Sequence, residues 1–437
     1  MKIIYSIFAA CLIAATGCQS NSLPNPDETE FTPLFDGKTW LGWSLPENNQ
    51  YQITDGAIHL PAGGKGNLLT EKQYSDFVLR FEFKLTPGAN NGLAIRAPLQ
   101  SGSLAYEGME LQILDNPGAR EKYKDKLRPN QYHGAIYNIA APNKIDDLLN
   151  APGEWNTQEV IALGRRIVVR VNGRKIVDYD LNSITDPKIL RKHPGILRAS
   201  GHIGFLGHND EVFFRNLRIK ELPVVDRENR PPPGFTSLFD GQSLAGWNGL
   251  LLPPNDNPIK RAALTPEARI AAQAVADENM LAHWSVEEGT IHFDGKGKSL
   301  STARHDYANY ELHCDWKITA NGDSGIYLRG VPQVQIWDAR AEGERNQKGS
   351  GGLYNNEKGG GDPGKKADHA AGTWNRFRIL IIGDRVHVFL NNQLVLKDVP
   401  LENYWDRKSP LPPSGPIELQ AHGNPLWFKN IYIREIK

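Results

Sequence analysis

The run at 108–115, GMELQILD, carries side chains that could do chemistry within a pattern typical of a β-strand. Alternation places Glu110 and Gln112 on one face of this strand. The other face is apolar and holds Met109, Leu111 and Ile113. A carboxylate can act as a general base, whereas an amide can only exchange hydrogen bonds. The alternative is that Glu110 lies on an ordinary solvated sheet face.

Other polar side chains that could join Glu110 lie near the ends of further predicted strands. In the first half of the chain these are Asn91, Arg96, Asp115, His133, Tyr137 and His208. Arg96 could instead pair with Glu110 across neighbouring strands, and His208 could simply cap a turn. No HExxH, GxSxG or EF-hand pattern is present. No cofactor is predicted with certainty, and a loose carboxylate–His site for a divalent cation is left open.

The chain repeats one large unit, and this repeat decides its organisation. FTPLFDGKTWLGW at 31–43 returns as FTSLFDGQSLAGW at 235–247, and ELQILD at 110–115 returns as QVQIWD at 333–338. Candidate site residues at or beside equivalent positions of the second unit are Ser324, Arg329, Gln333, Gln335, Trp337, Asp338, Tyr354 and His422. We therefore predict related domains at 31–222 and 235–437, joined by a charged, proline-rich linker at 223–234.

The elements that must position these residues are short strands separated by Gly, Asn, Asp and Pro. DFVLRFEFKL at 76–85 alternates as a half-buried antiparallel strand does. Asn172-Gly173 and Asn391-Asn392 each separate two alternating runs, which predicts hairpins. Many short antiparallel strands predict an all-β protein made of two tandem sandwiches or jelly rolls.

The second unit contains an insertion at 248–280 that is expected to be helical. Thr265 would be the N-cap and Pro266 would occupy the first turn. Apolar residues follow at helical spacing, namely Ile270, Ala271, Ala274 and Val275. This amphipathic helix would lie over a sheet or against the first domain.

Residues 1–18, MKIIYSIFAACLIAATGC, have the charged start, apolar run and small-residue end of an export signal. Their end is similar to a bacterial lipobox, which predicts a lipid on Cys18. The protein would then be anchored in the bacterial envelope, in the periplasm or on the outer membrane, by a polar tether at 19–30. Plain secretion is the alternative.

Charge and cysteine content limit the partners. Lys plus Arg and Asp plus Glu both number 50, so no net charge attracts nucleic acid, and the lipid is the one expected contact with a membrane. Cys314 is the one cysteine outside the signal and the lipid site, which excludes a disulfide framework and a cysteine metal site. It occupies an apolar position of an alternating strand, so a core role is favoured over a reactive one.

The order of the landmarks resembles the bacterial 3-keto-disaccharide hydrolase family. They are FVLRFEFKL, NNGLAIR, GMELQILD, HGAIY, EWN, VNG, HIGFLGH and FFRNLRI, and each unit resembles the family over nearly its whole length. The resemblance implies a concanavalin A-like jelly roll and cleavage of glycosides whose ring carries a ketone at carbon 3. At matching positions it implies a site of Asn91, Arg96, Glu110, Gln112, Asp115, Tyr137 and His208. His133 lies beside a motif, but Ser350 stands at its position in the second unit.

The chemistry that this resemblance implies starts from the acidity of a proton next to a ketone. Loss of the proton at carbon 2 lets the glycosidic oxygen leave by elimination, after which water can add. As a hypothesis, Glu110 or Asp115 with His208 supplies base and acid, and Arg96 steadies the enolate. A conventional glycosidase needs two carboxylates around the bond, and Glu110 and Asp115 are spread too far along one strand to form that pair.

The second unit departs from the first where Glu110 becomes Gln333. It could bind a sugar without cleaving it, or use Asp338 as its base. Trp337 could stack on a sugar ring or pack beneath the inserted helix. The leading hypothesis is an envelope enzyme that cleaves 3-keto-glycosides, by elimination and hydration or by hydrolysis. The alternatives are a glycan-binding, lectin-like lipoprotein and a structural envelope protein.

Overall fold

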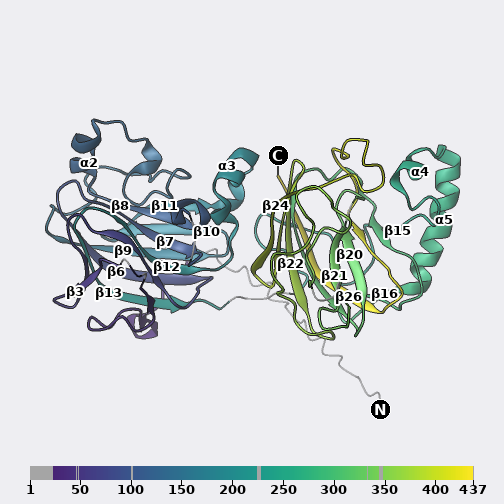
Figure 1. The fold of residues 1–437 in the computed structure, drawn as a ribbon, viewed down its shortest axis with the longest axis horizontal. Helices are drawn as coiled ribbons and strands as arrows, with labels where there is room; N and C mark the ends of the chain where they lie inside the picture. Colours follow the sequence, from purple (N-terminus) through teal and green to yellow (C-terminus); the bar gives the residue numbers. More distant parts are fainter. Residues whose placement is uncertain are drawn as a thin grey trace, which may run out of the picture.

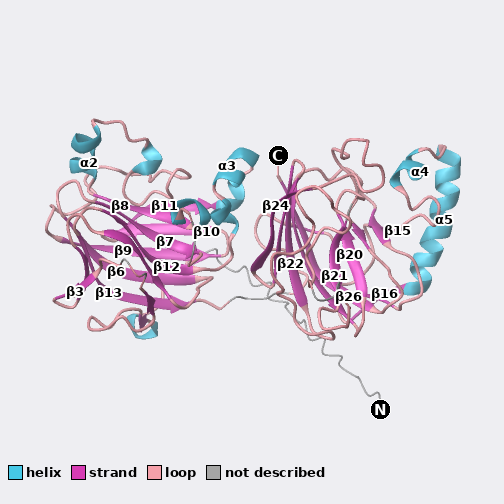
Figure 2. Cartoon of the chain, viewed as in Figure 1, coloured by secondary structure: helices cyan, strands magenta, loops and turns pink. Residues whose placement is uncertain are grey.

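The structure, a computed structural model, describes residues 23–45, 47, 49–99, 102–223, 228–331, 333–343 and 348–436. The expected signal peptide, Cys18 and the start of the tether lie outside these residues and stay predictions. Within the described ranges, no helix is long and apolar enough to cross a membrane. Two β-sandwiches follow each other along the long axis (Figure 1), and strands dominate both (Figure 2).

The first unit is a sandwich of two antiparallel sheets. The eight-stranded sheet has the order β11-β10-β9-β6-β13-β4-β3, with β1 beside β13, and the five-stranded sheet has the order β2-β5-β12-β7-β8. The strands are β1 (Thr32–Pro33), β2 (Trp43–Ser44), β3 (Gln52–Thr54), β4 (Ala57–Leu60), β5 (Lys65–Thr70), β6 (Phe77–Leu85), β7 (Asn90–Ala97), β8 (Met109–Leu114), β9 (Trp155–Leu163), β10 (Arg166–Val171), β11 (Arg174–Asp180), β12 (His202–His208) and β13 (Val212–Glu221).

The second unit repeats this topology strand for strand. Its sheets have the orders β16-β17-β26-β19-β22-β23-β24, with β14 beside β26, and β15-β18-β25-β20-β21. The strands are β14 (Thr236–Ser237), β15 (Trp247–Gly249), β16 (Trp284–Glu287), β17 (Thr290–Phe293), β18 (Leu300–Thr302), β19 (Tyr310–Ile318), β20 (Asp323–Tyr327), β21 (Gln333–Trp337), β22 (Asn375–Ile382), β23 (Arg385–Leu390), β24 (Gln393–Pro400), β25 (Glu418–Leu419) and β26 (Leu426–Glu435). The predicted pair of tandem jelly-roll sandwiches is therefore confirmed.

Helices sit at the edges of the sandwiches, and those other than α5 are short (Figure 2). The α-helices are α1 (Leu104–Glu107), α2 (Asn116–Tyr123), α3 (Pro187–Lys192), α4 (Pro258–Ala262) and α5 (Pro266–His283). The 3-10 helices are η1 (Glu28–Glu30), η2 (Pro129–Gln131), η3 (Leu181–Ser183) and η4 (Pro194–Leu197).

Alternation decides which side chains fill the sandwiches. One face of β6 is buried in the core of the first unit, through Phe77, Leu79, Phe81, Phe83 and Leu85. Asn172 and Gly173 join β10 to β11 with φ values of 48° and 76°, the positive values that a two-residue hairpin turn requires. Cys314 is buried in the core of the second unit. These observations confirm the predicted strand, hairpin and core cysteine.

The inserted helix forms, but its predicted buried face is wrong. Thr265 caps α5 and accepts a hydrogen bond from the N–H of Ala268, as expected. Ile270 is 73% exposed, however, and the buried residues of α5 are Ala276 and Met280. The helix packs on β15 and β16 of its own unit, at the end far from the first unit (Figure 1).

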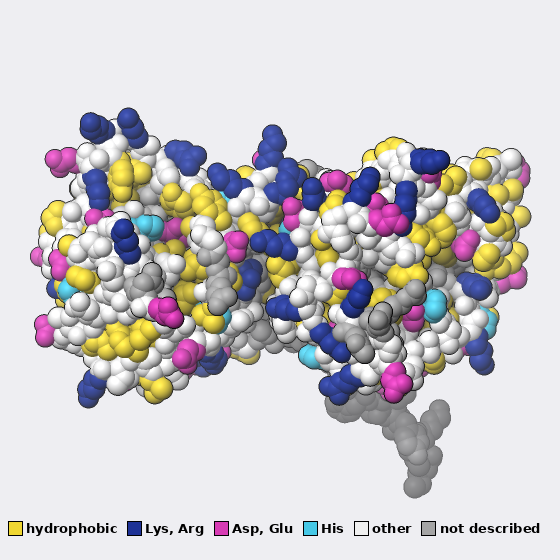
Figure 3. Space-filling view, viewed as in Figure 1, with side chains coloured by type: hydrophobic (Ala, Val, Ile, Leu, Met, Phe, Trp, Pro, Cys, Tyr) yellow, Lys and Arg dark blue, Asp and Glu magenta, His cyan; other side chains and the backbone are white. Residues whose placement is uncertain are grey.

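The two units touch through the eight-stranded sheet of the second. Buried side chains of that sheet and of the C-terminus belong to the same apolar cluster as the first core, namely Leu380, Ile382, Phe389 and Ile436. Arg434 donates to the carbonyl of Asn182 in the first unit at 3.2 Å and to the carboxylate of Glu311 at 2.7 Å. On the visible face, Lys and Arg are interspersed with Asp and Glu (Figure 3), as the balanced composition leads one to expect.

Candidate functional site

The candidate site lies on the outer face of the five-stranded sheet of the first unit. β8 is an edge strand of this sheet, and Met109, Leu111 and Ile113 point from it into the core, as predicted. Glu110 and Gln112 therefore point outward. Each is nevertheless only 3% exposed, and the segment 134–137 hydrogen-bonds to the backbone of both residues.

Glu110 faces His208 across this sheet. His208 Nε2 lies 3.6 Å from Glu110 Oε1, and the His208 side chain is 42% exposed. The Glu110 side chain lies over Gly92 of β7, where an added Cβ would come within 2.2 Å of Oε1. The missing side chain at Gly92 thus makes room for the carboxylate. A buried carboxylate beside an exposed imidazole can take up a proton and pass one on.

Gln112 and Asn90 form an amide pair on the same face. Gln112 Nε2 donates to Asn90 Oδ1 at 2.6 Å and, at 3.4 Å, to the carbonyl of Asn91. The N–H of Asn90 donates to Asp210 Oδ2 at 3.0 Å, which fixes the start of β7. Amides held in this way can bind hydroxyl or carbonyl groups of a ligand. Asn90 is not among the residues predicted from the sequence.

Tyr137 also comes together with Glu110. Its N–H donates to the carbonyl of Glu110 at 2.9 Å, beside an antiparallel bridge between Leu111 and Ile136. Directly opposed residues share a face of a sheet, so Tyr137 lies on the outer face with Glu110. Its hydroxyl accepts a hydrogen bond from Gln131 Nε2 at 3.2 Å and keeps a hydrogen to donate.

Asp115 does not join this group, because it caps a helix. It is the N-cap of α2, and its Oδ2 accepts from the N–H groups of Gly88 at 2.7 Å and Gly118 at 3.2 Å. Its counterpart Asp338 accepts from the N–H of Asn321 at 2.9 Å. In both units this carboxylate binds backbone N–H groups, so its presence is explained by its support of the local fold. The expected role of Asp115 as base or acid has no support in this geometry.

Arg96 and its counterpart Arg329 hold the sandwich together. Arg96 is 1% exposed and donates to the carbonyl of Ser75 at 2.9 Å and to Asp76 Oδ1 at 3.2 Å. Arg329 Nε donates to the carbonyl of Ala308 at 2.9 Å. Both arginines have positive φ values, 50° and 55°, which mark the same kink. The ion pair of Arg96 is therefore not with Glu110, and its buried guanidinium does not lie where it could steady an enolate.

Asn91 and His133, two further expected binding residues, lie inside the sandwich. The Oδ1 of the fully buried Asn91 accepts from the N–H of Gly92 at 2.9 Å. His133 stacks on Phe83 at 5.0 Å between ring centroids and accepts from the N–H of Leu114 at 3.1 Å. Burial lowers the pKa of His133 to about 4, which keeps the ring neutral at pH 7.

The counterparts of these two residues are buried as well. Ser324 stands at the position of Asn91 and donates to the carbonyl of Gln420 at 2.7 Å. Ser350 stands at the position of His133 and accepts from the N–H of Trp337 at 2.9 Å. The side chains at both positions therefore hydrogen-bond the backbone in each unit, although the residue types differ.

The second unit carries a different polar set on the equivalent outer face. Gln333 Nε2 donates to Gln335 Oε1 at 2.6 Å, and Gln335 Nε2 donates to Asp323 Oδ1 at 2.6 Å. His422 Nδ1 lies 3.6 Å from Asp323 Oδ2. The structure thus brings together the predicted residues Gln333, Gln335 and His422. It gathers them around Asp323, which the sequence reasoning missed.

Aromatic side chains stand beside this second set. Trp337 and Tyr354 line a cavity of about 150 Å³ together with Gln335, and the ion pair of Lys348 with Asp362 forms another wall. Trp337 lies on the edge strand β21, whereas α5 packs on β15 at the opposite edge. It therefore does not pack beneath the inserted helix.

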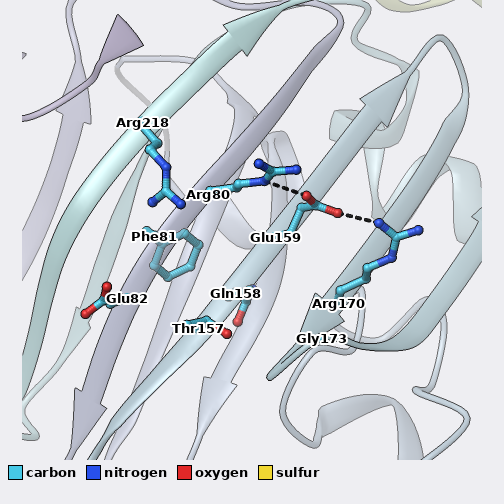
Figure 4. Close-up of a pocket in the computed structure, with 9 residues that line it drawn as sticks. All are labelled: Arg80, Phe81, Glu82, Thr157, Gln158, Glu159, Arg170, Gly173 and Arg218. Carbon is cyan, nitrogen blue, oxygen red and sulfur yellow. Dashed lines mark hydrogen bonds and ion pairs between the residues drawn. The ribbon is translucent and has the colours of Figure 1, made fainter. Parts of the chain in front are cut away.

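A further hollow lies on the eight-stranded sheet of the first unit (Figure 4). It measures about 520 Å³, and its lining includes Arg80, Glu82, Gln158, Glu159, Arg170 and Arg218. Glu159 accepts from Arg80 and Arg170, each at 2.7 Å. Arg80 and Arg218 also bind Glu28 at 2.7 Å. Because these charges neutralise one another on the sheet that does not carry Glu110, we assign the hollow no chemistry.

One signal in the sequence could have led to Asn90 and Asp323. They are equivalent positions next to a polar residue and a retained glycine, and one carries an amide where the other carries a carboxylate.

Across the part of the chain that the structure describes, no three His, Cys, Asp or Glu side chains are close enough together to hold a metal ion.

Comparison with known proteins points to one family for both units. The model of the 3-keto-alpha-glucoside-1,2-lyase-like domain matches residues 30–220 and 234–434. A 3-keto-disaccharide hydrolase of Bacteroides thetaiotaomicron is 26% identical over 247 residues, covering 47% of this chain and 83% of that protein. Two solved structures from Parabacteroides distasonis, provisionally named glycosyl hydrolases, are 24% and 28% identical. They cover 46% and 44% of this chain and 99% of their own, each with a TM-score of 0.39. Because the family model matches nearly all of both units, the chain belongs to the 3-keto-alpha-glucoside-1,2-lyase-like domain family.

Proposed function

We propose that the chain is a glycoside-cleaving enzyme and that its first unit acts on 3-keto-glycosides. The observation that carries this proposal is the pair of Glu110 and His208, held on the outer sheet face over Gly92. Membership of the family supports the substrate class, as does the name of the Bacteroides thetaiotaomicron relative.

In the proposed reaction, Glu110 takes the proton from carbon 2, next to the ketone at carbon 3. The electron pair of the broken C–H bond forms an enolate, and its return expels the glycosidic oxygen from carbon 1 and leaves a double bond between carbons 1 and 2. His208 gives its proton to the departing oxygen. Water then adds across the double bond, with its hydroxyl on carbon 1 and a proton on carbon 2, and releases the 3-keto sugar.

The enolate oxygen needs a donor other than the buried Arg96. The Tyr137 hydroxyl and the amide groups of Asn90 and Gln112 are the donors on the face that carries Glu110. A donor fixed in advance at a developing oxyanion contributes about 10²–10³-fold to a rate. We assign this task to the Tyr137 hydroxyl, because Tyr137 lies directly opposite Glu110.

Hydrolysis by a conventional pair of carboxylates is less well supported. That mechanism needs two carboxyl groups about 5 Å or about 6.5–9.5 Å apart around the scissile bond. Asp115, the second candidate, is bound as a helix cap. One carboxylate with one imidazole suffices for elimination, which therefore agrees better with this site.

The test compares a 3-keto-glucoside with its unoxidised parent glucoside. The wild-type chain should cleave the former and leave the latter intact, because the parent lacks the acidic proton. Glu110→Gln should lower the rate by about 10²–10⁴-fold, the usual contribution of a general base. The exposed Glu154→Gln serves as the matched control and should have no effect. A Glu110→Gln variant as fast as the control would remove Glu110 from the mechanism.

A second candidate function is glycan binding without cleavage. It is favoured by the cavity next to Trp337 and Tyr354 in the unit that lacks Glu110. Calorimetric titration with the same two glucosides decides between the functions. Binding of both sugars with turnover of neither would support a lectin-like protein.

We also propose that Cys18 is lipidated and anchors the enzyme to the bacterial envelope. The small residues before this cysteine support the proposal. The full chain produced in bacteria should be recovered with membranes until detergent is added. Cys18→Ser should be recovered without detergent, and equal recovery of both proteins from membranes would contradict the anchor.

A further inference from the structure

The outer faces of the two units can be compared residue by residue, because their strands pair in the same register. In the first unit Gly92 lies opposite Gln112 and Ala94 lies opposite Glu110. In the second unit the corresponding pairs are Gly325 with Gln335 and Tyr327 with Gln333. Asn90, which lies opposite Leu114, therefore corresponds to Asp323, which lies opposite Trp337.

This comparison shows an exchange of a carboxylate and an amide. The first unit has Asn90 on β7 and Glu110 on β8, whereas the second has Asp323 on β20 and Gln333 on β21. Each unit thus keeps one carboxylate and one amide, on opposite strands of the same pair. The second unit therefore lacks a carboxylate at the position of Glu110 but has one, Asp323, on the neighbouring strand.

Each unit has a histidine beside its carboxylate: His208 is the last residue of β12, and His422 lies beyond the end of β25. His208 approaches Glu110 through Nε2 at 3.6 Å, and His422 approaches Asp323 through Nδ1, also at 3.6 Å. The two imidazoles thus present different nitrogens to their carboxylates. A carboxylate–imidazole pair is thus present in both units, although the carboxylate lies on a different strand in each. We take this as an indication that the pair has a function.

Asp323 also fixes the orientation of both glutamines. A carboxylate accepts hydrogen bonds, so it must receive the NH₂ group of Gln335, whose Oε1 then accepts from Gln333 Nε2. Gln333 Oε1 is left buried with no protein partner, although the residue is only 3% exposed. A buried acceptor without a partner is costly, and a ligand hydroxyl at this position would satisfy it.

The pair remains accessible to a ligand. The side chains of Asp323 and His422 are 33% and 57% exposed. Further along the same sheet face, Arg261 of α4 donates to Glu418 at 2.9 Å, and Glu418 lies opposite Tyr327. In the first unit the matching pair is Gly204 and Ala94, and Ala94 is covered there by an apolar cluster that includes Leu104 of α1 and Leu206.

We propose that the second unit is a second acid–base site, in which Asp323 and His422 take the parts of Glu110 and His208. Its ligand is a 3-keto-glycoside, with a ring hydroxyl on Gln333 Oε1 and a ring face against Trp337. Because the base acts from β20 instead of β21, this site takes the other anomer. The inference rests on the proposed reaction of the first unit.

The experiment measures cleavage of α- and β-linked nitrophenyl 3-keto-glucosides by the wild-type chain, Glu110→Gln, Asp323→Asn and the double variant. Glu110→Gln should keep measurable cleavage of at least one anomer, and the double variant should lose this remainder by about 10²-fold or more, as expected for loss of a general base. His422→Gln in the Glu110→Gln background should move the acidic or basic limb of the pH profile of the remainder, which a merely structural role would not do.

The control is another carboxylate–histidine pair of the second unit. Asp294 lies 3.0 Å from His283, and its side chain is 37% exposed, close to the 33% of Asp323. Asp294→Asn in the Glu110→Gln background should leave the remainder unchanged. Thermal unfolding of every variant shows that the fold is kept.

Two results would overturn the inference, and they are distinguishable. If Glu110→Gln abolishes cleavage of both anomers while Asp323→Asn changes neither, the second unit has no catalytic pair and the proposed function of the first unit stands. If the wild-type chain cleaves neither anomer, the proposed function itself fails.

Discussion

Replacing Gly92 by alanine is expected to inactivate the first unit while leaving it folded. The new Cβ would lie 2.2 Å from Oε1 and 2.7 Å from Cδ of Glu110, so the carboxylate must move by about 1 Å to restore ordinary contact. A displacement of about 1 Å in a catalytic group costs about 10²-fold in rate. The φ value of Gly92 is not positive, so alanine does not strain the backbone.

The assay is kcat/KM on a 3-keto-glucoside, read beside the free energy of unfolding in urea. Overpacking costs about 1–3 kcal/mol, and the lower end applies here because Glu110 can swing aside. Gly102→Ala is the matched control, because no atom lies within 4 Å of its added Cβ. It should leave both quantities unchanged.

The double variant of Gly92→Ala with Glu110→Gln sharpens the test. If both changes act on the same carboxylate, the double variant should be no slower than Glu110→Gln alone. A folded Gly92→Ala variant with wild-type kcat/KM would refute the reasoning, since the position of Glu110 would then not matter.

Three further predictions concern residues that support the fold. Arg96→Ala should lower the free energy of unfolding in urea by about 3–5 kcal/mol, because it removes the buried guanidinium that pairs with Asp76 and donates to the carbonyl of Ser75; an unchanged midpoint would contradict this. Asp115→Ala should cost about 1 kcal/mol as a lost N-cap, and a hundredfold loss of kcat/KM would return Asp115 to the catalytic group. Burial lowers the pKa of His133 from the ordinary 6.5 to about 4 in the fold. As pH falls, the unfolded chain therefore binds a proton at His133 before the folded chain does, and stability is lost between about pH 6.5 and 4. His133→Gln should reduce the dependence of the free energy of unfolding on pH by at most about 1.4 kcal/mol per pH unit. Urea unfolding at pH 7 and pH 5 measures this dependence, and an unchanged dependence would contradict the argument that His133 is buried in its neutral form.

The sequence predicts the fold well because it contains two copies of one alternating pattern. Met109, Leu111 and Ile113 face the core because a strand alternates regardless of its neighbours. Asn172-Gly173 forms a hairpin because the turn has local requirements that few residues meet. Such features depend on residues close together in the chain, and for that reason they could be predicted.

The candidate site was only partly predictable, because faces and partners depend on distant segments. Asn90 and Asn91 are adjacent amides, and a strand register fixed elsewhere decides that Asn90 faces outward. Arg96, Asp115 and His133 have residue types suited to catalysis, yet their partners are backbone groups and side chains brought in by folding. A polar residue within a motif can therefore be there to hydrogen-bond the backbone and not to contact a ligand.

The inserted helix shows the same limit. The pair Thr265-Pro266 correctly predicts the N-cap, which is a local property. The buried face is instead set by contacts with β15, where Gly249 accepts from Gln273 Nε2 at 2.8 Å and donates to Asp277 Oδ1 at 2.9 Å. These polar contacts turn Ala276 toward the sheet and leave Ile270 in solvent.

Removal of the proton at carbon 2 by Glu110 is the central claim, and an isotope label tests it most directly. A 3-keto-glucoside with deuterium at carbon 2 would be cleaved in ordinary water by the wild-type chain and by Glu110→Gln. We predict slower cleavage of the labelled substrate than of the unlabelled one, release of the deuterium to water, and a fall of both cleavage and deuterium release in Glu110→Gln to the remainder assigned to the second unit. Cleavage at the same rate, with deuterium fully retained in the 3-keto sugar at early times, would contradict the account.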